Sequence, residues 1–145
     1  MFSKEITYED YNGGQRTEKF YFNLNESELT EMELEIPGGL SGLIERIVSA
    51  QDIPTITKTF KVIILRSYGQ KSPDGKRFIK NKELTEEFIQ TDAYNKLFME
   101  ILQDDTKGSD FIKNVIPKAY AEALEKEEQK GKEVRLVTEG TGVAE

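Results

Sequence analysis

Adjacent carboxylates are the residues of this chain that come nearest to catalytic chemistry. Asp104 and Asp105 follow one another directly, and paired acids can act as general acid and base when both face a substrate. Neighbouring positions on a helix do not share a face, and nothing supplies an electrophile or a partner base. We therefore expect these two acids to end a helix or to be solvated.

The residue types that are missing narrow the chemistry further. The 145-residue sequence contains no histidine and no cysteine. This removes the usual general base, the usual zinc ligand, thiolate nucleophiles and disulfides. The sequence predicts a protein that is not an enzyme and that uses no metal or cofactor.

A basic segment offers a different chemistry, the binding of phosphate backbones. Residues 58–82 carry eight Lys or Arg and a single acid, and Tyr68 and Phe78 lie among them. Such a segment can contact nucleic acid, which is the alternative function that we retain. A solvated basic face is the more usual meaning, and no nucleic-acid-binding module is present. The turn Ser72-Pro73-Asp74-Gly75 within it matches neither pattern of a phosphate-binding loop.

The charges of the whole chain form bands. Residues 1–40 have a net charge of -6, residues 58–82 of +7 and residues 83–116 of -5. Bands of opposite sign can pair within the fold or with a partner protein.

The N-terminal residues predict a β-hairpin that could position such surfaces. Apolar residues alternate with polar ones around Ile6 and again from Phe20 to Leu24, which is the period of a strand. A three-residue loop at residues 12–14 would place Asp10 opposite Arg16, Ile6 opposite Phe20 and Phe2 opposite Leu24. We expect this apolar face to be core. Tyr21 lies on the other face and is a candidate for an outward contact.

The rest of the chain predicts short helices. Asn25 and Glu28 have the spacing of a capping box and open a helix that ends before Pro37. Further helices are expected at Leu40 to Val48, after Asp52 and Pro54, at Glu83 to Gln90, from Asp92 through Leu102, from a cap at Ser109 or Asp110, and after Pro117.

One segment leaves two structures open. The run from Pro54 to Gly69 is long enough for a buried helix with Gly69 just beyond its end. The β-branched residues within 58–66 would equally suit a strand.

The expected architecture is an α+β fold, mainly α, in which the hairpin packs on about five or six short helices. We expect a single domain over residues 1–130, with the hairpin at 1–24 and a helical body at 25–130. Residues 131–145 are expected to form a mobile, disordered tail. The start has no signal-peptide pattern, and no stretch is long enough to span a membrane.

Several stretches in their order and spacing resemble the tail assembly chaperones of long-tailed bacteriophages. They are "ITYEDYNGGQRTEKFYFNL", "ELTEMELE", "GGLSGLIERIVSAQD", "SYGQKSPDGKRF" and "FIQTDAYNKLFMEIL", which together span about residues 5–117. The resemblance implies a non-enzymatic protein that binds the phage tape measure protein and keeps it soluble while the tail tube assembles. It also implies action in the host cytoplasm and absence from the mature virion.

The resemblance also bears on further partners. In many relatives a frameshifted, longer product engages the tail tube protein, and this chain resembles the shorter product. Nucleic acid and membrane are not expected partners, and self-association is left open.

A partner-binding surface is predicted on the acidic helix and beside it. The amphipathic stripes of the longer helices are needed for the core, which leaves the short helix at Glu28 to Glu35 and the neighbouring Tyr21. Met32 and Met99 could line a groove for a helical client, or could fill the core. The candidate partner-binding residues are Tyr21, Glu28, Glu31, Met32, Glu33 and Glu35.

Overall fold

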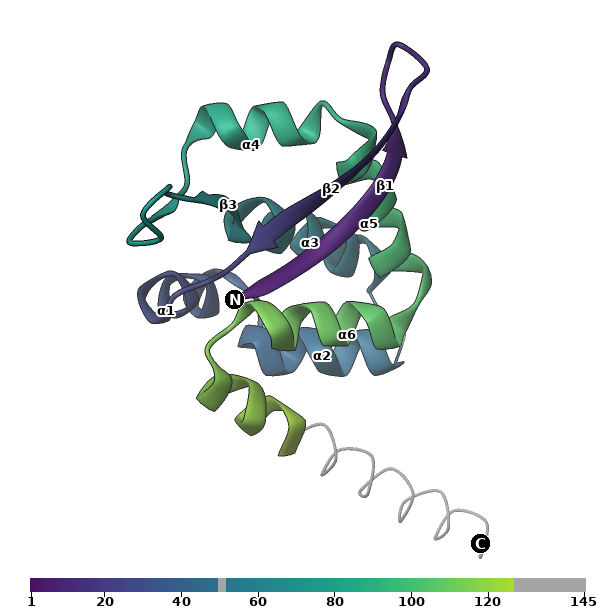
Figure 1. The fold of residues 1–145 in the computed structure, drawn as a ribbon. Coiled ribbons are helices and arrows are strands. Elements are labelled where there is room, and N and C mark those ends of the chain that lie inside the picture. Colours follow the sequence, from purple (N-terminus) through teal and green to yellow (C-terminus); the bar gives the residue numbers. More distant parts are fainter. Residues whose placement is uncertain (50–51, 127–145) are drawn as a thin grey trace, which may run out of the picture.

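The computed structural model describes residues 1–49 and 52–126 (Figure 1). Its elements in chain order are β1 (Phe2–Glu9), β2 (Gln15–Phe22), α1 (Glu26–Glu35), α2 (Gly39–Ser49), α3 (Ile53–Ser67), β3 (Tyr68–Lys71), β4 (Phe78–Ile79), α4 (Lys82–Ile89), α5 (Asp92–Gln103) and α6 (Asp105–Val115). Residues 118–126 are helical as well. The predicted α+β fold, mainly α, is confirmed. The predicted tail at 131–145 lies outside the described residues.

The strands form one antiparallel sheet in the order β1-β2-β3-β4. β1 and β2 pair along their whole lengths, whereas β2 and β3 pair only at Tyr21 with Gly69 and at Phe22 with Tyr68. The sequence analysis predicted no strand at residues 68–71 or 78–79, so β3 and β4 were missed. Four residues and two residues are too short to show a clear alternation.

The hairpin is confirmed, but its predicted register is wrong by two residues. Tyr8 faces Arg16, Lys4 faces Phe20 and Phe2 faces Phe22. The loop comprises residues 11–13, because the Asp10 N–H donates to the Gly14 carbonyl at 2.8 Å and Gly13 takes a φ of 82°. Gly13, and not Gly14, thus takes the left-handed position that ends a three-residue loop. A shift of two residues keeps every side chain on its predicted face.

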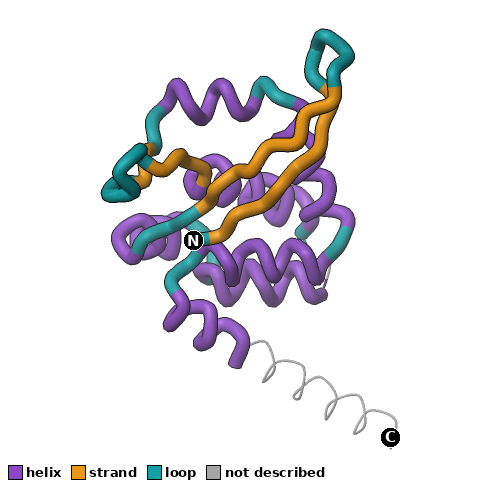
Figure 2. Tube along the Cα trace, viewed as in Figure 1, coloured by secondary structure: helices purple, strands orange, loops and turns teal. Residues whose placement is uncertain are grey.

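The sheet lies across one side of the helices, as Figures 1 and 2 show. Phe22 has no exposed surface and is at the centre of an aromatic cluster. Its ring centre lies 5.4 to 6.2 Å from the ring centres of Phe2, Tyr68, Phe88 and Phe111. These contacts join β1, β2, β3, α4 and α6, so the predicted core face of the hairpin is confirmed.

The start of α1 and the break after it follow the prediction. The Asn25 side chain accepts a hydrogen bond from the Glu28 N–H at 2.9 Å, and the Glu28 carboxylate accepts one from the Asn25 N–H at 3.0 Å. Leu29 and Met32 are buried, whereas Leu34 is 87% exposed. The helix therefore packs Leu29 and Met32 against the core and leaves Leu34 in solvent.

The ambiguous segment 58–66 is a helix, since α3 runs from Ile53 to Ser67. Asp52 caps its start, as expected, but Gly69 is not the residue that ends it. Tyr68 is the C-cap, and Gly69 is already in β3. A β-carbon on Gly69 would come within 2.8 Å of the Phe78 ring and the Ile79 carbonyl, so glycine is required by the close approach of β4.

The helix predicted to begin at Ser109 or Asp110 begins earlier. Asp104 caps α6 by accepting hydrogen bonds from the N–H groups of Thr106 and Lys107, at 2.9 and 3.2 Å. Ser109 is buried inside the helix. The small Gly108 allows the Phe60 ring of α3 to approach closely. In the part of the chain that the structure describes, no helix is long and apolar enough to cross a membrane.

Candidate partner-binding surface

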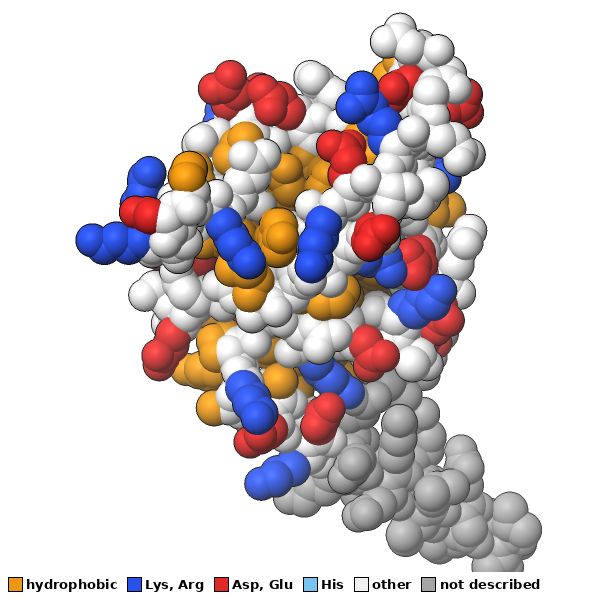
Figure 3. Space-filling view, viewed as in Figure 1, with side chains coloured by type: hydrophobic (Ala, Val, Ile, Leu, Met, Phe, Trp, Pro, Cys, Tyr) orange, Lys and Arg blue, Asp and Glu red, His pale blue; other side chains and the backbone are white. Residues whose placement is uncertain are grey.

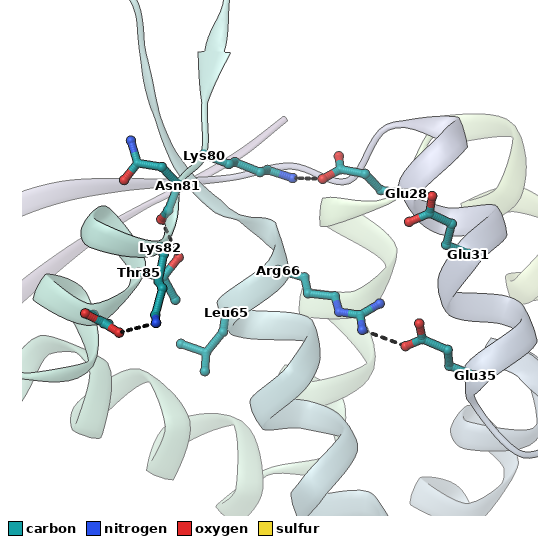
Figure 4. Close-up of a pocket in the computed structure, with 10 residues that line it drawn as sticks. Glu28, Glu31, Glu35, Leu65, Arg66, Lys80, Asn81, Lys82 and Thr85 are labelled. Atoms are coloured by element: carbon teal, nitrogen blue, oxygen red, sulfur yellow. Dashed lines mark hydrogen bonds and ion pairs between the residues drawn. The ribbon is translucent and has the colours of Figure 1, made fainter.

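An open groove of about 590 Å³ lies between α1 and the segment that joins β4 to α4 (Figure 4). One wall is acidic and carries Glu28, Glu31 and Glu35, which recur every three or four residues on one face of α1. The opposite wall is formed by α3, residues 80–81 and α4, and it carries three basic side chains. Its residues are Leu65, Arg66, Lys80, Asn81, Lys82, Thr85 and Glu86.

Two ion pairs cross the groove. Lys80 Nζ lies 2.6 Å from a Glu28 carboxylate oxygen, and an Arg66 guanidinium nitrogen lies 2.6 Å from a Glu35 oxygen. Lys80 also donates to the Asn23 carbonyl at 2.6 Å, which ties the end of β2 to the start of α1. These pairs show that the first acidic band and the basic band meet within the fold.

Glu31 lies between the two ion pairs. Its side chain is exposed, and none of the interactions drawn in Figure 4 reaches it. Neither a hydrogen bond nor an ion pair joins its carboxylate to another described residue. Of the three α1 glutamates in the groove, Glu31 is thus the one whose charge is available to a partner.

The structure separates the remaining predicted residues from this groove. Met32 is fully buried, so its side chain cannot line an open surface, and its predicted place there is wrong. It points into the core because it shares a helix face with Leu29. Glu33 faces α2, where its carboxylate accepts a hydrogen bond from the Leu40 N–H at 3.0 Å and so caps that helix.

Tyr21 also lies apart from the groove residues. It is half-buried on the outer face of the sheet, with Lys71 Nζ 4.5 Å and Lys19 Nζ 5.9 Å from its ring centre. Lysines over an aromatic face gain a cation–π attraction. A partner that contacts the Tyr21 ring would therefore also meet two positive charges. The sequence analysis did not predict this arrangement.

The sequence analysis did not include the basic wall in the site, although the opposite signs of the charge bands indicated that they could pair within the fold. Arg66, Lys80 and Lys82 belong to the segment that raised the nucleic-acid alternative, and each forms an ion pair with a glutamate. Lys76 and Arg77 are exposed in the turn between β3 and β4. The segment thus contributes three residues to ion pairs within the fold and two to an exposed turn.

The paired acids Asp104 and Asp105, and Met99, do not line the groove. Asp104 ends α5 and caps α6, which confirms the expectation that these acids mark a helix end. Met99 is 40% exposed on α5 and is not part of the groove.

Comparison with known proteins identifies the family. The family model described as "Phage tail assembly chaperone" matches residues 1–144. Neither the curated proteins nor the solved structures contain a match to this chain. The family match covers nearly the whole sequence, including all the elements described above. The chain therefore belongs to the phage tail assembly chaperone family.

Proposed function

We propose that this chain binds the phage tape measure protein and keeps it soluble while the tail tube assembles. Family membership gives the role in tail assembly, and the groove beside α1 supplies a surface for a client. A chaperone that must release its client needs a modest and accessible surface, which fits an open groove better than an enclosed cavity.

The observation that carries this assignment is the unpaired Glu31 between two ion pairs. A client helix could place a basic side chain against Glu31 and apolar side chains against Leu65, which is half-buried in the groove. Leu34, one turn further along α1, offers a second apolar contact because it is 87% exposed. Charge would set the orientation of the client, and the apolar contacts would add affinity.

The wider setting follows from the same proposal. The chain would act in the host cytoplasm without enzymatic activity and would be absent from the mature virion. A longer, frameshifted product would engage the tail tube protein. The family membership supports this setting.

The test is co-expression of the full chain with the tape measure protein. We expect the wild-type chain to move the tape measure protein into the soluble fraction and to co-purify with it. Glu31→Lys should reduce the co-purified amount at least tenfold. Glu87→Lys is the matched control, because Glu87 is an exposed helical glutamate outside the groove.

The two parts of the proposal fail separately. A tape measure protein that stays insoluble with the wild-type chain contradicts the function. Full co-purification by Glu31→Lys leaves the function standing and rejects the groove as the client surface. Glu33 is left unchanged in this design because it caps α2.

A further inference from the structure

One edge of β2 is open over most of its length. β2 pairs with β1 from Gln15 to Phe22, but β3 pairs with β2 only at Tyr21 and Phe22. In an antiparallel ladder the backbone groups of alternate residues point to opposite sides. The Asn23 N–H donates to the Ser67 carbonyl of α3, so odd-numbered residues of β2 point away from β1. Within the described residues, no hydrogen bond from another element reaches the backbone of Gln15, Thr17 or Lys19.

The ladder between β2 and β3 ends where charges of the same sign would meet. Continuing the observed register would place Lys19 opposite Lys71. Like charges directly opposite each other destabilise a strand pair. β3 instead turns to pair with β4, and β2 continues alone beside β1.

This open edge belongs to an arm that projects from the body. All residues from Tyr11 to Lys19 are exposed, and Figure 1 shows the hairpin extending beyond the helices. The open β2 edge of the arm, whose tip is at the top right in Figure 3, is therefore accessible to another strand. A two-stranded ribbon is only marginally stable by itself in water, so a further strand would stabilise it.

The other edge of the sheet is protected, which sets the β2 edge apart. Lys96 Nζ donates to the carbonyl of Thr7 in β1 at 3.0 Å. Lys96 belongs to α5, so a helix side chain occupies a carbonyl that an added strand would need, and covering an edge with a helix is a recognised means of blocking strand addition. Thr7 and Thr17 are directly paired, but their backbone N–H and C=O groups point to opposite edges of the hairpin. Those of Thr7 point to the blocked β1 edge, and those of Thr17 point to the open β2 edge.

The sequence of the open edge is complementary to itself. We propose that two copies of this chain pair through β2, antiparallel about a two-fold axis at Thr17. Residue 17 then faces its own copy, Gln15 faces Lys19, and Arg16 faces Glu18 of the other chain. This isologous contact closes on itself and joins the two sheets into one.

The charged pair can form across the axis without loss of existing contacts. Arg16 uses Nε to hold Asp10 at 2.8 Å, which leaves the other two guanidinium nitrogens available. Glu18 accepts the Tyr8 hydroxyl on one oxygen, which leaves its second oxygen available. Two such Arg16–Glu18 pairs would flank the axis and fix the register.

The same pairing accounts for an exposed aromatic residue. In this register Gly14 of one copy lies opposite Phe20 of the other, so the loop at residues 11–13 falls beside the partner's body. Tyr11 in that loop is 89% exposed. By the same register this loop would lie at the level of residues 21–23, next to the start of β3.

A single cysteine tests the register directly, because the chain has none of its own. Residues opposite one another in a hydrogen-bonded pair have Cα atoms about 5.5 Å apart, which is within the range that a disulfide spans. Under mild oxidation Thr17→Cys should form a covalent dimer. Thr7→Cys, its direct neighbour on the blocked edge, should remain monomeric on a non-reducing gel.

A matched pair of proline variants tests the free association. Thr17→Pro removes an N–H from the open edge, and Thr7→Pro removes one from the blocked edge, so neither breaks the β1–β2 ladder. Both variants lose the same hydrogen bond between the two threonine hydroxyls. Sedimentation of the full chain should show a dimer whose Kd rises at least tenfold in Thr17→Pro and stays unchanged in Thr7→Pro.

The outcomes that overturn the proposal are equally defined. They are a wild-type chain that stays monomeric up to millimolar concentration, a dimer that both proline variants weaken equally, and equal cross-linking of the two cysteine variants. Circular dichroism verifies that each variant is folded, and the cysteine pair decides the question if a proline variant unfolds. The association requires no tape measure protein, so its failure leaves the proposed function untouched.

Discussion

Phe22 shows at the scale of one residue why an aromatic side chain follows the glycine turn so early in a polar chain. Four rings from different elements surround it, and water is excluded. Tyr21, one position away, is on the outer face beneath two lysines. The alternation along β2 thus separates a core residue from a surface residue within one peptide unit.

The first prediction follows from this burial. Phe22→Ala should lower the free energy of unfolding by about 3–5 kcal/mol, because it removes a large buried side chain and leaves a cavity. The melting temperature should fall by roughly 10 °C or more. Leu34→Ala is the control, since an apolar side chain that is 87% exposed should change stability by less than about 0.5 kcal/mol. An unaltered melting curve for Phe22→Ala would contradict its central place in the core.

At the scale of elements, the sequence predicted the kind of secondary structure better than the strand register and the element boundaries. The helices with long apolar stripes were predicted, because a stripe at helical spacing must face a core. The register of the hairpin was wrong because two adjacent glycines could each take the left-handed position, and the sequence does not say which. β3 and β4 were missed because a glycine such as Gly69 can either follow a helix end or permit the close approach of a strand, and the sequence does not distinguish the two.

The same distinction applies to the candidate site. The acidic face of α1 could be predicted from the capping box and the glutamate spacing. The groove could not, because its other wall consists of residues brought there by the packing of α3 and α4. Glu33 and Met32 had the same local pattern as their neighbours, and only the position of α2 and of the core separates their roles.

The hairpin turn provides a second prediction, on pH. The hydrogen bond from Arg16 holds the pKa of Asp10 below its usual range, with the Gly14 and Asn12 N–H groups adding to the effect. A lowered pKa in the folded state means that Asp10 stabilises the fold above the unfolded pKa, near about 3.9. This stabilisation is lost as pH falls through the folded pKa.

Thermal unfolding of Asp10→Ala between neutral and acid pH is the measurement. The variant should be less stable than the wild-type chain at pH 7, and the difference should shrink as the pH falls below about 4. Glu9→Ala is the control, because Glu9 has no hydrogen bond or ion pair among the described residues. A difference for Asp10→Ala that is constant across this range would contradict the linkage.

At the scale of the whole molecule, the charge bands become an internal contact. Arg66 and Lys80 meet glutamates of α1 across the groove, so the basic segment loses part of its charge to the fold. The chain as a whole carries a net charge of -7, which opposes association with polyanions. This distribution favours a protein partner over the nucleic-acid alternative.

A third prediction tests that alternative. DNA and RNA should show no tight binding at physiological salt in fluorescence anisotropy, and Lys76→Glu with Arg77→Glu should leave the signal unchanged. Both residues are exposed in the turn between β3 and β4. Tight binding that falls steeply with salt and vanishes in the double variant would restore the nucleic-acid function.

The pairing of Phe22 with Tyr68 has a consequence for how the chain reaches its fold. The hairpin can form from neighbouring residues within microseconds, but β3 joins it only after α1, α2 and α3 have been traversed. Closing so long a connection costs entropy before the contact is gained, which slows the step. During synthesis the hairpin therefore leaves the ribosome before the residues that cover Phe22 exist, so the nascent protein transiently exposes the apolar face of the hairpin.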